Sequence, residues 1–314
     1  MKTIENLWAH LALLTVNLIY GANYVLAKDI MPDYILPNGL ILIRVAGATL
    51  LLWIVRLFIW EKVNRKDLIL IAFCALFGVS LNQLFFFNGL NLTSPINSSI
   101  IMTSNPIMVV ILAFFLLKER IQPLKITGVI VGTFGAVWLI LLGNPHGSGT
   151  SSILGDIYIF INSLTYALYL VLVKPLMSKY KPITVITLVF TFGLGYIMLY
   201  PPVWTELRLV DFSAIPAFIY WEIAFVIVAV TFLAYLLNIF ALKIVSPSIA
   251  SSYIYLQPVF AGVFAWLFMS WLKADYVQDI TLEKVFCSLL IALGVYLISV
   301  SSKKQKRLEQ QIKS

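Results

Sequence analysis

The sequence predicts an all-α integral membrane protein of about ten transmembrane helices, arranged as two inverted five-helix repeats. Hydrophobic residues make up 61% of the 314 residues and charged residues only 11%, whereas roughly a quarter of the residues of a soluble domain are charged. The charged residues occur in short clusters. The apolar runs between them are about twenty residues long, the length that crosses the hydrocarbon core of a bilayer as a helix. The two halves of the chain also match each other.

Ten apolar segments, separated by short clusters of charged residues, are expected to form helices. The connections are short, and the longest, near 204–215, is too short for a soluble domain. The chain also lacks the glycine-rich phosphate loop that ends in Lys-Ser or Lys-Thr. We therefore expect no ATP-driven transport by this chain alone. The expected helices cover residues 8–27, 37–59, 68–87, 95–117, 123–142, 153–173, 182–203, 216–242, 247–271 and 282–300.

Lysine and arginine are distributed unevenly among the connections. With a cytoplasmic N-terminus, 17 of the 22 lysine and arginine residues fall in cytoplasmic segments, four fall outside, and Arg44 lies within a helix. Because positive residues are enriched in cytoplasmic loops, this split predicts a multi-pass protein of the plasma (inner) membrane with both termini cytoplasmic. The net charge of +8 forms no single basic patch. The expected partners are therefore the lipid bilayer and a small-molecule substrate, with no nucleic acid.

The two halves match when the sequence is shifted by 146 residues in one block and by 152 residues in another. The match includes prolines, which are scarce inside helices. Each half holds an odd number of helices, so the second half enters the membrane from the opposite side. Such inverted repeats are the architecture of secondary transporters; a duplication without transport, as in a channel or membrane enzyme, is the alternative. The predicted units are 1–145, 146–302 and a basic cytoplasmic tail, 303–314. The matched residues are Tyr20, Val25, Leu26, Lys28 and Met31 with Tyr166, Val171, Leu172, Lys174 and Met177, then Leu81, Leu84, Leu90, Ser94, Pro95, Ser99 and Pro106 with Leu233, Leu236, Leu242, Ser246, Pro247, Ser251 and Pro258.

Polar and aromatic residues recur at helical spacing along several of the expected helices. In the segment 153–173, for example, Asn162, Tyr166 and Tyr169 share one face. Polar groups that face lipid are costly, so such faces are expected to turn inward and to line a substrate cavity. The alternative is hydrogen bonding between helices, which uses the same residue types. The predicted cavity residues are Asn17, Tyr20, Asn23, Tyr24, Arg44, Asn82, Ser98, Met102, Asn105, Asn162, Tyr166, Tyr169, Tyr235, Asn238, Ser251, Tyr255 and Gln257.

Two prolines, Pro106 and Pro258, are expected near the middle of their helices at matched positions of the two halves. A proline inside a helix frees the carbonyl group four residues earlier, here at Met102 and Ile254. The symmetric placement favours a functional kink or hinge at mid-membrane that exposes polar backbone groups. A kink that serves packing alone is the alternative.

Arg44 is the one charged residue well inside an apolar segment. An intramembrane charge is a candidate functional group. We expect Arg44 to meet a substrate carboxylate or phosphate, or to hold a gate closed. The alternative is that it reaches outward to the membrane interface or pairs with Asp29 or Asp33.

These motifs resemble the EamA family of the drug/metabolite transporter superfamily, over nearly the whole chain. The resemblance implies export or exchange of small metabolites, often amino acids, without ATP. One departure is the stretch from Trp271 to Asp275, which replaces a Gly-Glu pair that the family usually has there. The residues that carry the resemblance are Tyr20-Gly21-Ala22-Asn23-Tyr24 with Lys28, Arg44, Asn105-Pro106, Leu117-Lys118-Glu119-Arg120, Gly128, Gly135, Gln257-Pro258 and Gly294-Val295-Tyr296-Leu297.

Together these observations predict a secondary transporter of small organic metabolites that exports amino acids or related compounds by alternating access. A channel or lipid-handling protein is the alternative, with an intramembrane enzyme as a weaker one. The chain has no His-Glu-x-x-His, no Gly-x-Ser-x-Gly and no pair of deep aspartates. We therefore expect no enzymatic activity, no catalytic residues, no metal and no cofactor. The expected state is a monomer or a weak homodimer.

Overall fold

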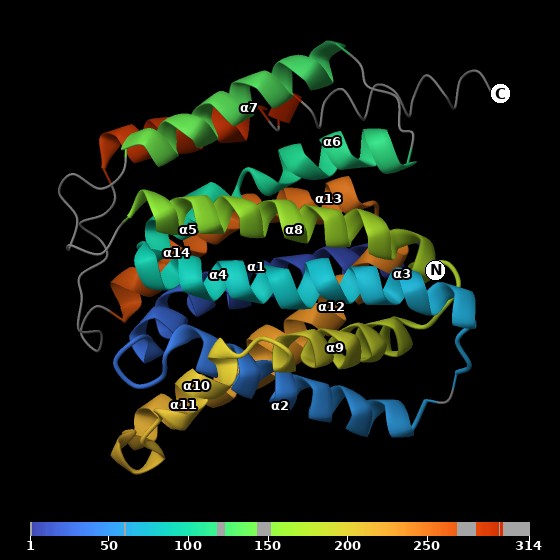
Figure 1. Cartoon of the computed structure of the whole chain (residues 1–314). Helices are drawn as coiled ribbons and strands as arrows, with labels where there is room; N and C mark the ends of the chain where they lie inside the picture. Colours follow the sequence, from blue (N-terminus) through green and yellow to red (C-terminus); the bar gives the residue numbers. More distant parts are fainter. Residues whose placement is uncertain are drawn as a thin grey trace.

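The computed structural model describes residues 2–59, 61–117, 123–142, 152–268, 281–294 and 296–297. Within these residues the regular structure is helical, with no strand, which confirms the predicted all-α class. The helices lie side by side in a bundle (Figure 1). The predicted tail at 303–314 and the stretch from Trp271 to Asp275 lie outside the described residues.

Several of the helices adjoin one another and are consecutive pieces of one longer helical segment. Residues 282–294 are also helical. The labelled elements are α1 (Lys2–Ile30), α2 (Pro37–Leu57), α3 (Arg65–Ala75), η1 (Leu76–Ser80), α4 (Leu81–Leu92), α5 (Pro95–Met102), α6 (Asn105–Leu117), α7 (Pro123–Leu142), α8 (Ile153–Met177), α9 (Pro182–Met198), α10 (Pro202–Arg208), η2 (Phe212–Ala214), α11 (Ala217–Phe225), η3 (Val226–Leu233), α12 (Ala234–Ile244), α13 (Pro247–Ser252), η4 (Tyr253–Leu256) and α14 (Gln257–Leu267).

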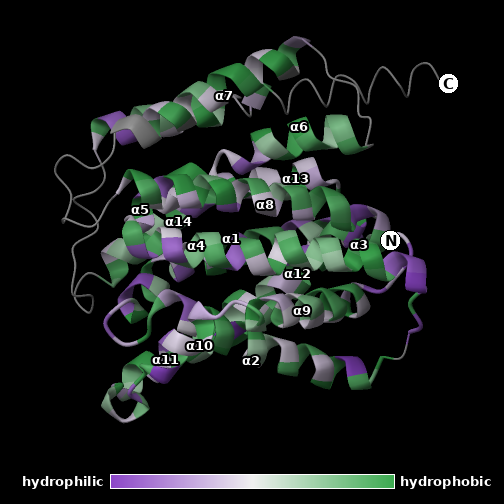
Figure 2. Ribbon diagram, viewed as in Figure 1, coloured by the Kyte–Doolittle hydropathy of each residue, from purple (hydrophilic) through white to green (hydrophobic). Residues whose placement is uncertain are grey.

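Seven helical segments of the described chain are long and apolar enough to cross a membrane, and an eighth is counted if α9 and α10, bent by 79°, form one span. Apolar residues dominate along the helices, and hydrophilic residues gather at their ends and in the connections (Figure 2). The protein is therefore a multi-pass membrane protein. The exact number of ten helices stays a prediction.

Local sequence signals explain where many helices begin. Proline occupies the first turn of α2, α5, α9 and α13, where its missing N–H costs no helical hydrogen bond. Side chains also cap three N-termini: Asn64 accepts from the Lys66 amide, Ser94 from Asn97 and Ser152 from Gly155.

The two halves run in opposite directions through the bundle. Lys28, near the end of α1, donates to the carbonyl groups of Leu90 and Asn91 at the end of α4. The amide of Ser152, which precedes α8, donates to the carbonyl of Leu92 at that same end of α4. The last turn of α1 and the first turn of α8 therefore lie at one end of the molecule, and these equivalent helices are antiparallel.

The first helix of each half packs mainly against the other half. α1 packs mainly against α12 and α14 of the second half, whereas α8 packs mainly against α4 and α6 of the first half. The repeats therefore interlock and do not form two separate bundles, and the core is built where they cross.

Both predicted proline sites are breaks between helices. α5 ends at Met102, and α6 begins at Asn105 with Pro106 in its first turn. In the second half, η4 is a 3₁₀ turn between α13 and α14, and Pro258 lies in the first turn of α14. The breaks lie at the two predicted prolines, but their form differs from a kink within one helix. Each proline starts a new helix, where its ring is tolerated, and does not bend a continuous one.

Two segments of π-helix occupy matched places that the sequence did not reveal. η1 lies between α3 and α4, and η3 lies between α11 and α12. At the offset of 152 that relates these parts of the halves, Leu76–Ser80 falls within Val226–Leu233. π-Helical turns are rare and are frequent at functional sites.

A close contact between α1 and α14 depends on a glycine. A Cβ atom added to Gly21 would clash with the Cβ of Phe260 and would lie 3.1 Å from its carbonyl carbon. Those atoms belong to or adjoin the backbone, so they cannot rotate away. Small residues allow this kind of close approach between membrane helices.

We predict that Gly21→Ala lowers the free energy of unfolding by about 1–3 kcal/mol, because the added methyl overpacks this contact. Thermal unfolding of the purified protein in detergent measures the change. Gly195→Ala is the matched control, since a Cβ at that helical position meets nothing within 4 Å. Equal stability of the two variants would contradict the prediction.

Candidate substrate cavity

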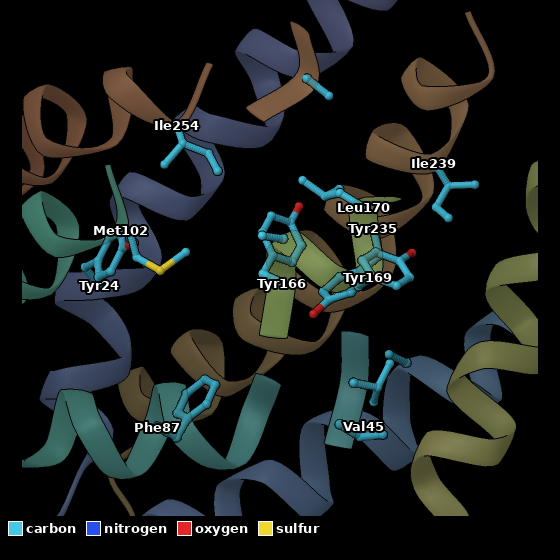
Figure 3. Packing of buried hydrophobic residues seen from close by; sticks show 14 of the residues in the cluster. Tyr24, Val45, Phe87, Met102, Tyr166, Tyr169, Leu170, Tyr235, Ile239 and Ile254 are labelled. Atoms are coloured by element: carbon cyan, nitrogen blue, oxygen red, sulfur yellow. The ribbon is translucent and has the colours of Figure 1, made fainter. Parts of the chain in front are cut away.

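A polar cavity lies where the two halves cross. It is lined from both halves by α1, α2, α4, α5, α8, η3, α12 and α14. Ten of the seventeen predicted residues line it, and Gln83, Phe86 and Val230 line it in addition. In Figure 3, Tyr166 and Tyr169 of α8 group with Tyr235 of α12. The predicted residues at the cavity are Tyr20, Asn23, Tyr24, Arg44, Asn82, Met102, Asn162, Tyr166, Tyr235 and Gln257.

The cavity is small. Its volume is about 50 Å³, well below the range of about 300–1,000 Å³ typical of small-molecule sites. A small organic substrate therefore needs more room than the cavity offers in this conformation.

Arg44 is the charged group of this cavity and is 2% exposed. Its Nε donates to Thr231 Oγ1 at 2.9 Å, and its guanidinium carbon lies 4.3 Å from the centre of the Phe87 ring. No described carboxylate forms an ion pair with it. The predicted alternatives, an interface position or a pair with Asp29 or Asp33, are therefore wrong. α2 crosses η3 at this depth and keeps the side chain inside.

The two π-helical segments supply polar contacts at the cavity. Thr231 of η3 accepts from Arg44 and donates to the carbonyl of Val226, five residues earlier. The hydroxyl of Tyr235 donates to the carbonyl of Gly78 in η1 at 3.1 Å and accepts from Gln83 Nε2 at 2.7 Å. The irregular helical turns thus connect directly to the cavity wall.

The side-chain amide of Gln257, at the start of α14, connects the cavity wall to α1. Gln257 accepts from the Tyr24 hydroxyl at 2.7 Å and donates from Nε2 to Asn17 Oδ1 at 2.8 Å. The matched residue of the first half, Asn105, donates to the carbonyl of Ser163 in α8 at 2.6 Å. In both halves, therefore, the residue before the proline binds the first helix of the other half.

Seven predicted residues lie outside the cavity lining. Asn17 and Asn238 support it, since Asn238 Nδ2 donates to Tyr166 Oη at 2.6 Å. Asn105 links two helices, as the interhelical alternative predicted. The others are Ser98, Tyr169, Ser251 and Tyr255, of which Tyr169 stacks on Tyr166 with ring centres 6.1 Å apart.

The sequence pattern predicts Asn82 as an inward position of its helix and misses the neighbouring Gln83. Both side chains reach the cavity from consecutive positions of α4. The π-helical turn immediately before α4 changes the facing of the residues that follow, and regular helical spacing does not describe it. No motif in the sequence signals this shift.

A bundle of membrane-length helices around a polar cavity is typical of membrane transport proteins. The chain belongs to the EamA-like transporter family, because the model of that family matches residues 7–141 and again residues 153–300. The resemblance predicted from the motifs is confirmed.

Relatives of similar length are named as transporters. YyaM of Bacillus subtilis (strain 168), an uncharacterized transporter, is 27% identical over 307 residues, which cover 96% of this chain and 99% of YyaM. An uncharacterized transporter of Archaeoglobus fulgidus is 27% identical over 267 residues, 84% of this chain and 89% of its own. One crystal structure is similar with a TM-score of 0.62 at 15% identity, covering 95% of this chain and 98% of that chain, and shows the fold alone.

We predict that Thr231→Val lowers the free energy of unfolding by about 1–3 kcal/mol, because it removes the acceptor of the buried Arg44 Nε–H while keeping the side-chain shape. Thr231→Ser keeps the hydroxyl and is the matched control. Denaturant unfolding in detergent compares the two. A valine variant as stable as the serine variant would show that this hydrogen bond contributes little.

Proposed function

We propose that this membrane transporter is a secondary carrier that exports small organic metabolites, amino acids or related compounds, by alternating access. The observation that carries the proposal is the environment of Arg44. A guanidinium is buried at the crossing of the two halves, faces the cavity, and has no described carboxylate as a partner.

A buried charge without a counterion is unfavourable by several kcal/mol relative to a paired one. The guanidinium fork matches a carboxylate with two parallel hydrogen bonds. A substrate carboxylate would therefore supply the missing partner of Arg44. The single protein hydrogen bond to Nε leaves the outer nitrogens for that role.

The remaining lining suits an amino acid. The side-chain oxygens of Asn23 and Asn162 are buried and have no hydrogen-bond partner in the described structure, and both residues line the cavity. An acceptor buried without a donor is costly. An ammonium or hydroxyl group of the substrate would satisfy these oxygens.

Alternating access fits the connections at the two ends of the bundle. At one end, Lys179 binds Asp67 at 2.9 Å and the Tyr180 hydroxyl donates to the same carboxylate. The hydrogen bond to Asp67 raises the pKa of Lys179 above its ordinary value, which keeps this link charged. At the other end, Glu206 accepts from the Asn38 and Gly39 amides at the start of α2.

Each of these links joins the two halves of the chain. We propose that they break in turn as the cavity opens to one side and then to the other. The charge distribution supports placing the Asp67–Lys179 end in the cytoplasm, with the termini at the same side of the inner membrane.

We predict that Arg44→Ala lowers saturable uptake of amino acids into proteoliposomes by about tenfold or more, because a charge-assisted pair with the carboxylate is lost. Arg44→Lys is the matched variant, because it keeps the positive charge but lacks the two-pronged guanidinium. Its uptake is expected to lie between that of the parent protein and that of Arg44→Ala. Preloaded vesicles should show counterflow. Flux that never saturates would instead indicate a channel, and transport unchanged in Arg44→Ala would reject the carboxylate contact.

A further inference from the structure

A second and larger cavity lies beside the polar one, between α1, α11 and α14. Its volume is about 750 Å³, which is within the range of about 300–1,000 Å³ typical of small-molecule sites. None of its residues belongs to the central cavity. The lining residues are Leu18, Ile19, Ala22, Leu26 and Asp29 of α1, Phe218, Trp221, Glu222 and Phe225 of α11, and Phe264 and Phe268 at the end of α14.

The cavity is open to the outside of the bundle. Leu18 is 42% exposed, Phe218 52% and Trp221 78%. These helices are among the candidate membrane spans, so the opening faces the hydrocarbon region and its border. An occupant must therefore carry a large apolar surface.

Aromatic rings form much of the wall. Phe225 and Trp221 come from one helix, and the rings of Phe264 and Phe268 stack with centres 5.6 Å apart. The faces of aromatic rings attract cations, and aromatic walls of this kind are used to bind quaternary ammonium groups. The wall thus suits apolar molecules and favours those that bear a positive charge.

Two carboxylates also line the cavity, Asp29 and Glu222, while its described lining contains no lysine or arginine. They come from α1 and α11, two helices that contact each other. The Glu222 Oε2 atom is buried and has no hydrogen-bond partner among the described residues. An unpartnered carboxylate oxygen in an apolar wall is costly and accepts only a donor or a cation.

We propose that this lateral cavity binds a hydrophobic organic cation, with its charged centre at Glu222 and its apolar body against the aromatic wall. A lipid headgroup that carries an ammonium also carries a phosphate, which two adjacent carboxylates would repel. The charge of the lining therefore favours a free organic cation over a phospholipid. This site is separate from the proposed carboxylate contact at Arg44.

The test uses two probes of matched shape and opposite charge, tetraphenylphosphonium and tetraphenylborate. Equilibrium dialysis against the full chain in nanodiscs measures their binding. We expect saturable binding of the phosphonium and none of the borate. Glu222→Gln should weaken phosphonium binding about tenfold or more, which corresponds to the loss of one charge-assisted contact.

Glu5→Gln is the matched control, because Glu5 is an exposed residue of α1 outside the cavity and the substitution is the same. It should leave binding unchanged. Thermal unfolding confirms that each variant is folded. Equal binding of the two probes would show an unselective, lipid-filled groove. Equal phosphonium binding by Glu222→Gln and the parent protein would also overturn the proposal, as would no saturable binding at all.

Discussion

The burial of one guanidinium at the crossing of the two halves is the constraint on which the centre of this protein depends. Arg44 enters from α2, binds Thr231 of η3 and lies over the ring of Phe87. These contacts bring three elements from both halves to one point. Because membrane hydrocarbon cannot solvate a charge, the surrounding helices must supply polar groups at that depth. The neighbouring amides and phenols of the cavity follow from the same requirement.

Irregular backbone occurs around this charge at paired places. Two π-helical turns and two helix breaks lie in the bundle at equivalent positions of the halves. Backbone outside regular α-helix is tolerated at membrane depth only where protein or a polar cavity satisfies its groups. The contacts of Tyr235 with Gly78 and of Thr231 with Val226 satisfy it here. The irregular turns and the cavity therefore depend on each other.

Much of the fold could be predicted from the sequence, because lipid imposes simple rules on helix length and composition. Inward faces were also predictable where the helix is regular, as for Asn162 and Tyr166 of α8. The π-helical turns were not predictable, because they leave no local motif; η1 packs against α9 and η3 against α2, helices that are distant in the sequence. Gln83 was missed for that reason. The sequence leaves four outcomes open for Arg44, because it does not say which helix crosses α2.

The lysines at the ends of the first helices have a mechanical consequence. Lys28 holds the end of α4 within the first half, and Lys174 holds the carbonyls of Leu242 and Val245 at the end of α12 within the second. The bonds of Asn105 and Gln257 instead join opposite halves. The first helix of each half is thus hydrogen-bonded at its end to its own half and near its middle to the other half. A tilt of α1 or α8 would therefore strain hydrogen bonds to both halves at once.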